Sequence, residues 1–154
     1  MNATVIIPTT GSPELRYALE SALSQNKTNV YVVCDGERYK GRVRTIVDDY
    51  AGLDNLKVCY LPLNVGANGF YGHRIYAAFT HLINTKYVLY LDQDCWLEPW
   101  HVQSCIETIE KNDLDWSYSL RRIHLDDFLC NDECESLGKD RKSTRLNSSH
   151  TDIS

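Results

Sequence analysis

The sequence contains no long hydrophobic run and no excess of basic residues. No apolar stretch approaches the roughly 20 residues that a helix needs to cross a bilayer, and the first residues lack the basic and apolar regions of a signal peptide. Basic residues number 16 against 21 acidic ones, for a formal net charge of −5. This balance provides no electrostatic attraction for nucleic acid. We therefore expect a cytoplasmic protein with no transmembrane segment and no nucleic-acid partner.

The chain of 154 residues contains 6 cysteines. In the expected compartment these would be reduced thiols, so we do not expect disulfides to hold the fold. Most of them lie within or beside apolar runs, where free cysteine packs as a small hydrophobic residue. Cys130 and Cys134 instead form a C-x3-C spacing in a polar segment. A zinc site there would need further ligands, which the spacing does not supply.

Short apolar runs alternate with amphipathic stretches along the chain. The runs typical of strands are residues 4–7, 30–34, 58–61 and 87–91. The stretches with apolar residues at helical spacing are residues 15–23, 43–51, 75–83 and 102–109. We expect Ser12 and Pro13 to open the first helix, Pro99 to open the fourth, and residues 114–120 to form a fifth strand. The alternation predicts an α/β fold, a mostly parallel Rossmann-like sheet with helices on both faces.

Polar residues follow the predicted strands at the points where the strands end. Right-handed crossovers place the carboxyl ends of parallel strands along one edge of the sheet, where such sheets bind ligands. The residues at these ends are Pro8, Thr9, Thr10, Asp35, Asn64, Gly66, Asp92, Gln93 and Asp94. The sequence therefore predicts a ligand site along this edge.

Asp92 and Asp94 are the residues with the clearest chemistry. If the fourth strand continues through Gln93, the alternation of side chains points both carboxylates to the same side. Two neighbouring carboxylates repel each other unless a cation or proton joins them. A hard divalent cation such as Mg²⁺ or Mn²⁺ suits this pair and leaves positions for phosphate oxygens. The alternatives are two solvated acids or a helix cap before Pro99.

The other candidates each have a structural alternative. Asp35 could accept a hydrogen bond from a nucleobase or ribose, or could belong to an ordinary Asp-Gly turn. Thr9 and Thr10 could contact a base or cap the following helix. Residues 64–69 could let the backbone approach a ligand because of their glycines, or could form a flexible loop. Arg74 could hold a phosphate with two parallel hydrogen bonds, or could be exposed.

These motifs, in their order and spacing, resemble the start of a family 2 glycosyltransferase over residues 3 to about 120. They are an apolar strand followed by Pro-Thr, a strand ending in Asp-Gly, Asn-x-Gly before a helix, and an apolar strand ending in Asp-x-Asp. The resemblance implies a GT-A fold that binds a nucleoside-diphosphate sugar, often a UDP-sugar, with Mn²⁺ or Mg²⁺. It implies nucleotide contacts by Pro8, Thr9 and Asp35, nucleotide and diphosphate contacts by Asn64, Gly66 and Arg74, and ribose, metal and diphosphate contacts by Asp92 and Asp94.

The chain departs from the family pattern at two positions and in its C-terminal part. Thr10 and Gly11 replace the usual aromatic-Asn pair, and Gly72-His73-Arg74 replaces Ala-Arg-Asn. The family's general base is an acidic residue of a later, acceptor-binding half. The acids after residue 121 do not match its position; they are Asp126, Asp127, Asp132, Glu133 and Glu135.

We therefore expect three parts. Residues 1–121 would form the nucleotide-sugar-binding core, and residues 122–141, polar and acidic without a clear period, would belong to an incomplete acceptor-side half. Residues 142–154 have almost no apolar content, which is typical of a disordered tail. They also resemble an adaptor-derived translation, in which case the native sequence continues differently after about Arg141. The expected activity is metal-dependent, inverting transfer to an unknown acceptor, in a fragment that binds donor with little turnover.

Other functions fit the sequence less closely. A sugar-phosphate nucleotidyltransferase would need a loop rich in glycine and arginine after the first strand, and residues 9–12 contain one glycine and no basic residue. A dinucleotide-dependent oxidoreductase would need G-x-G-x-x-G there. A non-catalytic module that binds nucleotide or metal stays open, and its indifference to UDP and Mn²⁺ would distinguish it from a transferase.

Overall fold

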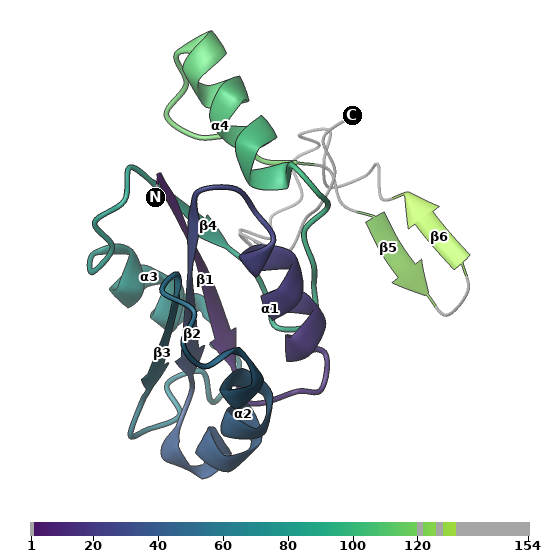
Figure 1. Ribbon diagram of the computed structural model, residues 1–154. Helices are drawn as coiled ribbons and strands as arrows, with labels where there is room; N and C mark the ends of the chain where they lie inside the picture. Colours follow the sequence, from purple (N-terminus) through teal and green to yellow (C-terminus); the bar gives the residue numbers. More distant parts are fainter. Residues whose placement is uncertain (1, 120–121, 126–127, 132–154) are drawn as a thin grey trace.

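The computed structural model describes residues 2–119, 122–125 and 128–131. Its main feature is a sheet of four parallel strands in the order β3-β2-β1-β4 (Figure 1). The strands are β1 (Ala3–Thr9), β2 (Thr28–Cys34), β3 (Leu56–Tyr60) and β4 (Tyr87–Tyr90). The helices are α1 (Leu15–Leu23), η1 (Glu37–Tyr39), α2 (Lys40–Val47), η2 (Asp48–Tyr50), α3 (His73–Thr80) and α4 (His101–Asn112). The predicted α/β fold with a parallel sheet is therefore confirmed.

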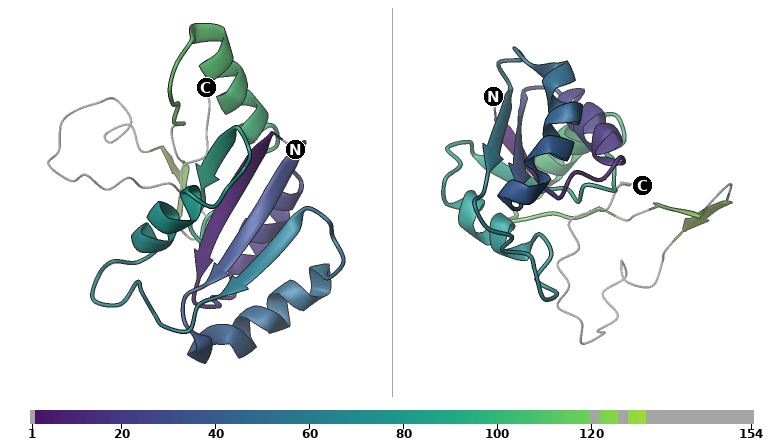
Figure 2. Two further views of the ribbon diagram at one scale, coloured as in Figure 1. Left: turned by 90° about the vertical axis from the view of Figure 1, so that its left-hand side faces the viewer. Right: turned by 90° about the horizontal axis from the view of Figure 1, so that it is seen from below.

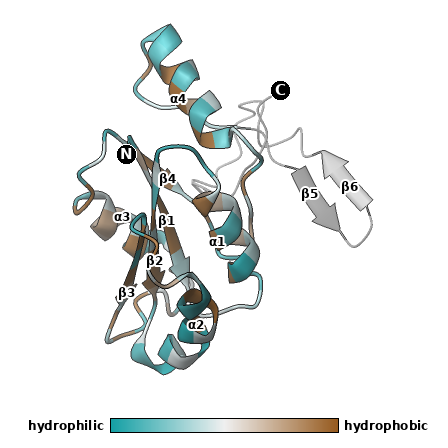
Figure 3. Cartoon of the chain, in the orientation of Figure 1, coloured by the Kyte–Doolittle hydropathy of each residue, from teal (hydrophilic) through white to brown (hydrophobic). Residues whose placement is uncertain are grey.

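Helices cover both faces of the sheet, because successive side chains of a strand point to opposite sides. Ala3, Val5 and Ile7 of β1 pack with apolar residues of α1 and α2 in one hydrophobic core. Ile6 packs on the other face with residues of α3. Figure 2 shows α3 on one side of the sheet and α1 with α2 on the other, and Figure 3 shows the apolar residues gathered on the strands between these layers.

The strands differ in burial according to their position in the sheet. All seven residues of β1 are buried, since β2 and β4 flank it and helices cover it. By contrast, β3 and β4 form the edges of this sheet, and most of their residues are half-buried. These two strands are less enclosed than β1 and β2 because each has a neighbouring strand on one side only in the described sheet.

The direction of the strand order reverses beside β1. The chain moves from β1 to β2 to β3 on one side of β1, and then crosses through α3 to place β4 on its other side. In open α/β sheets a crevice forms at the carboxyl ends of the strands where the order reverses. The crossovers thus direct a ligand site to the carboxyl ends of β1 and β4.

Two helices begin two residues later than their prolines predict. Pro13 and Glu14 form a turn, with Leu15 N donating to Ser12 O at 3.1 Å, and α1 then begins at Leu15. Before α4, Trp100 has a left-handed backbone conformation with φ of 70°, so the helix begins at His101 and not at Pro99. Ser12 makes no side-chain cap at the start of α1.

The expected fifth strand is also wrong. Residues 114–119 form no strand, and β4 stays an edge of the sheet as described. A strand requires a hydrogen-bonded neighbour, and this segment pairs with no described strand. The chain instead forms two antiparallel strands, β5 (Arg122–Leu125) and β6 (Phe128–Asn131), in a region whose sequence shows no clear period.

Several expectations fall on parts of the chain beyond the described residues. They concern Asp126, Asp127, Asp132, Glu133, Glu135, Cys134 and the tail from residue 142. Across the described ranges, none of the helices has the length and apolar character needed to cross a membrane.

Candidate functional site

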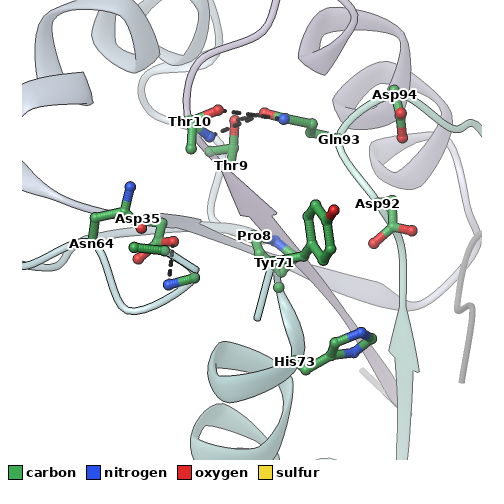
Figure 4. Close-up of a pocket in the computed structure, with 13 residues that line it drawn as sticks. Pro8, Thr9, Thr10, Asp35, Asn64, Tyr71, His73, Asp92, Gln93 and Asp94 are labelled. Carbon is green, nitrogen blue, oxygen red and sulfur yellow. Dashed lines mark hydrogen bonds between the residues drawn. The ribbon is translucent and has the colours of Figure 1, made fainter. Parts of the chain in front are cut away.

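A pocket of about 510 Å³ lies at the carboxyl ends of the parallel strands (Figure 4). All the predicted site residues except Arg74 line it; they are Pro8, Thr9, Thr10, Asp35, Asn64, Gly66, Asp92, Gln93 and Asp94. They come from the ends of all four strands, brought to one edge by the parallel topology. A second hollow of about 410 Å³ involves Tyr17, Glu20, Ser21 and Trp96, and shares no residue with the first.

Asp35 holds the loop that follows β3. Its side chain is buried, and its two oxygens accept hydrogen bonds from Val65 N at 2.7 Å and Gly66 N at 2.9 Å. A carboxylate that accepts backbone N–H bonds forms strong, charge-assisted interactions. Asp35 is therefore a loop anchor within the pocket, a role that its position at a strand end did not reveal.

Gly66 lies against protein atoms on its Cβ side. A Cβ there would come within 2.1 Å of Tyr71 O and 2.6 Å of Asp35 Oδ2. From the sequence, this glycine is expected to let the backbone approach a ligand. The structure shows instead that the missing Cβ makes room for Tyr71 and Asp35, which fold the loop back on itself.

Gln93 links the end of β4 to the turn after β1. Its Oε1 accepts hydrogen bonds from Thr9 Oγ1 at 2.7 Å and from Thr10 N at 3.0 Å. Thr9 Oγ1 in turn accepts a bond from Gly11 N at 2.9 Å. These bonds fix the two loops that flank the point where the strand order reverses, and they occupy the hydroxyl of Thr9 and the amide oxygen of Gln93.

Cys34 ends β2, directly before Asp35. It is fully buried, and this burial, reinforced by the negative charge of Asp35, raises the pKa of its thiol to about 11. Because the thiolate is the reactive form of cysteine, Cys34 stays protonated near neutral pH. Its role in this region is packing.

Asp92 and Asp94 both line the pocket, but they lie in the segment after β4 and not within the strand. β4 ends at Tyr90, and Cys95 N donates to Asp92 O at 3.1 Å in a turn. The strand geometry expected to align the two carboxylates is therefore absent at these positions. Asp92 is half-buried and accepts a hydrogen bond from the hydroxyl of Tyr76 at 2.6 Å, whereas Asp94 is exposed.

The donor atoms suit a hard divalent cation bound together with a ligand. The described residues contain no group of three or more His, Cys, Asp or Glu side chains able to hold a metal. The two carboxylates of Asp92 and Asp94 would supply only part of a coordination sphere. Mg²⁺ is commonly bound in this way, by one or two carboxylates with water and phosphate oxygens. These residues therefore fit Mg²⁺ or Mn²⁺ that arrives with a phosphate ligand.

The charge of the pocket is strongly one-sided. Asp35, Asp92 and Asp94 line it, and among the described lining residues none is lysine or arginine. His73 is the lining side chain that can take a positive charge. An anionic ligand in this pocket would be repelled by these like charges unless positive groups or backbone N–H donors offset them.

The structure adds Ala67, Tyr71, Gly72 and His73 to the lining. Tyr71 is 68% exposed, has a φ of 46°, and donates its N–H to Gly66 O at 2.9 Å. Figure 4 shows its ring standing between Pro8 and Asp92. The signal in the sequence is an aromatic pair enclosed by Gly69 and Gly72, directly after the segment 64–69 that was predicted to meet the ligand.

Arg74 is exposed and does not line the pocket. Its guanidinium lies 3.5 Å from the centroid of the Phe70 ring, and Nη1 donates to Val65 O at 3.2 Å. Arg74 therefore contacts the outer side of the loop and stabilises it in this conformation.

Asn64 has a buried side-chain oxygen that finds no hydrogen-bond partner among the described residues.

The sheet order, the crossovers and the pocket define a Rossmann-like α/β domain whose ligand site lies where the strand order reverses. Residues 4–145 match the protein family described as Glycosyl transferase family 2. The match covers most of the chain, so the chain belongs to glycosyl transferase family 2, as the motifs predict. Comparison with curated protein sequences gives no match. The family supports a glycosyl transfer function, with a nucleotide-sugar donor and an acceptor.

Proposed function

We propose that the pocket binds a nucleoside-diphosphate sugar, in particular a UDP-sugar, together with Mg²⁺ or Mn²⁺. The sugar would then be transferred to an acceptor hydroxyl with inversion at the anomeric carbon. Family membership supports the reaction type. The position of the pocket at the strand ends supports the binding of a nucleotide.

The acidic lining is the observation that carries the metal requirement. A diphosphate is an anion, and the described pocket offers it three aspartates and no lysine or arginine. A divalent cation between the phosphates and the two carboxylates Asp92 and Asp94 would remove this conflict. When bound, such a cation neutralises charge that develops on the departing diphosphate.

The residues of the chain would divide the remaining work. Asp35 fixes residues 64–66, and Gln93 fixes the turn after β1, so that both walls of the pocket are held before the ligand arrives. A wall that is already ordered reduces the entropy lost on binding. Pro8, Thr10 and Asn64 would contact the nucleoside from these walls.

We assign no general base among the described residues. Of the acids that line the pocket, Asp35 is bound to the loop and the other two are assigned to the cation. A missing positioned base lowers the rate by about two to four orders of magnitude. The proposal therefore includes donor binding by this chain with little or no multiple-turnover transfer.

Calorimetric titration of UDP tests the proposal. We expect UDP to bind more tightly with Mg²⁺ or Mn²⁺ than with a chelator, because a cation held by Asp92 and Asp94 would offset the repulsion between these carboxylates and the diphosphate. Asp94→Ala should abolish this difference. Asp54→Ala serves as the matched control, since Asp54 is also an exposed aspartate but precedes β3, at the opposite edge of the sheet. Equal affinity of the unmodified chain with metal and with chelator would reject the proposal.

A further inference from the structure

Tyr76 connects the face of the sheet covered by α3 to the pocket. It lies on α3, is 7% exposed, and its hydroxyl donates to Oδ1 of Asp92 at 2.6 Å. This length is typical of a charge-assisted hydrogen bond from a hydroxyl to a carboxylate. In the sequence Tyr76 belongs to no recognisable motif, and only the fold brings it to Asp92.

Packing holds the Tyr76 ring in place from two sides. The ring is tilted against Tyr90 with centroids 4.8 Å apart, and the hydroxyl of Tyr90 bonds to Thr80 at 2.8 Å. Gly72 lies on the other side, where a Cβ would meet Tyr76 at 3.2 Å and Pro8 at 2.8 Å. The start of α3 is therefore close against β1, and the phenol has little freedom to turn away from Asp92.

The Tyr76 hydroxyl holds one oxygen of the Asp92 carboxylate. Asp92 lies beyond the end of β4, so ladder hydrogen bonds do not hold its backbone as they hold Tyr90. Among the described residues, the Tyr76 hydroxyl is the group that donates a hydrogen bond to the carboxylate of Asp92. With Oδ1 held in this way, the carboxylate still has Oδ2 and further lone pairs for a ligand in the pocket.

We propose that Tyr76 is a positioning residue for cation-assisted diphosphate binding, acting by holding the carboxylate of Asp92. This inference rests on the function proposed above. Groups that hydrogen-bond to a metal-ligating carboxylate orient it, and their loss typically weakens metal affinity by about 10- to 100-fold. Tyr76 thereby links the packing of α3 to the affinity for the cation and nucleotide.

The test compares Tyr76→Phe with Tyr90→Phe. Both changes remove one hydrogen-bonded hydroxyl from neighbouring rings, but Tyr90 bonds to Thr80 and not to Asp92. UDP affinity is measured by calorimetry with Mg²⁺ and with a chelator, and circular dichroism verifies the fold. We expect Tyr76→Phe to weaken the Mg²⁺-dependent affinity by about 10- to 100-fold and to leave the affinity in chelator unchanged. Tyr90→Phe should leave both affinities unchanged.

A second variant keeps the tyrosine. Asp92→Asn should also remove the benefit of Mg²⁺, and adding Tyr76→Phe to it should cause no further loss, because the hydroxyl then has no carboxylate to position. Equal Mg²⁺-dependent affinity for Tyr76→Phe and the unmodified chain, equal losses with metal and chelator, or additive losses in the double variant would each overturn the role of Tyr76. Absence of any Mg²⁺ effect in the unmodified chain would instead remove the proposed function on which it rests.

Discussion

Gly66 and Asp35 show how single residues shape the pocket without needing a ligand. The carboxylate accepts two backbone N–H groups of the loop, and the glycine leaves room for that carboxylate and for the carbonyl of Tyr71. The two residues are far apart in the sequence and meet only because β2 and β3 are adjacent. The shape of this wall is therefore set by contacts within the protein.

Gly66→Ala tests this packing. The added methyl group would overlap Tyr71 O and Asp35 Oδ2, so we expect a loss of about 1–3 kcal/mol in the free energy of unfolding. UDP binding should weaken as well, because the loop would have to move. Gly41→Ala is the control: its Cβ would meet nothing within 4 Å, and it lies in α2. We expect that change to be neutral or stabilising by up to about 1 kcal/mol. Equal stability of the two variants in chemical denaturation would contradict the packing argument.

At the scale of elements, α4 is attached to the domain through α1. Gln25, which follows α1 and is 5% exposed, accepts a hydrogen bond from Val102 N at 3.1 Å. Its amide nitrogen donates to Glu98 O and to Ser21 O, each at 3.1 Å. Since no side chain caps α4 from its own N-terminus, Gln25 satisfies a backbone donor that would otherwise be unpaired.

Gln25→Ala should therefore destabilise the domain. Removing the amide leaves the buried N–H of Val102 without the acceptor that Gln25 provides, which typically costs about 1–3 kcal/mol. The matched control is Gln103→Ala on α4. Its amide donates to the exposed Glu107 at 2.8 Å, and we expect a change within about 0.5 kcal/mol. Denaturant unfolding measures both. Indistinguishable midpoints for the two variants would show that α4 does not depend on Gln25.

The order of elements was predictable because each strand or helix has a local signal. Runs of β-branched residues and helical spacing identify the elements without knowledge of their neighbours. Their exact starts were less predictable: Pro13 and Pro99 look like first-turn residues, but α1 begins at Leu15, and α4 begins only after Trp100, which adopts a left-handed conformation. Residues 114–119 have strand-like composition and lack a strand partner among the described residues.

At the scale of the whole molecule, topology explains why the site could be located from sequence. A parallel sheet brings all strand ends to one edge, so Thr9, Asp35 and Asp92 had to meet there once the fold was known. What each side chain does at that edge could not be read in the same way. The bonds of Asp35, Gln93 and Tyr76 join residues that are distant in sequence.

Mapping the bound nucleotide onto the fold tests the central claim, that the acidic pocket at the strand ends is the donor site. Backbone amide resonances of the chain would be followed by NMR during titration with UDP and Mg²⁺. We expect the largest shifts at Thr10, Gly66 and Asp94, and much smaller shifts when a chelator replaces Mg²⁺. Shifts concentrated instead around Tyr17 and Trp96, or no shifts at saturating nucleotide, would contradict the claim.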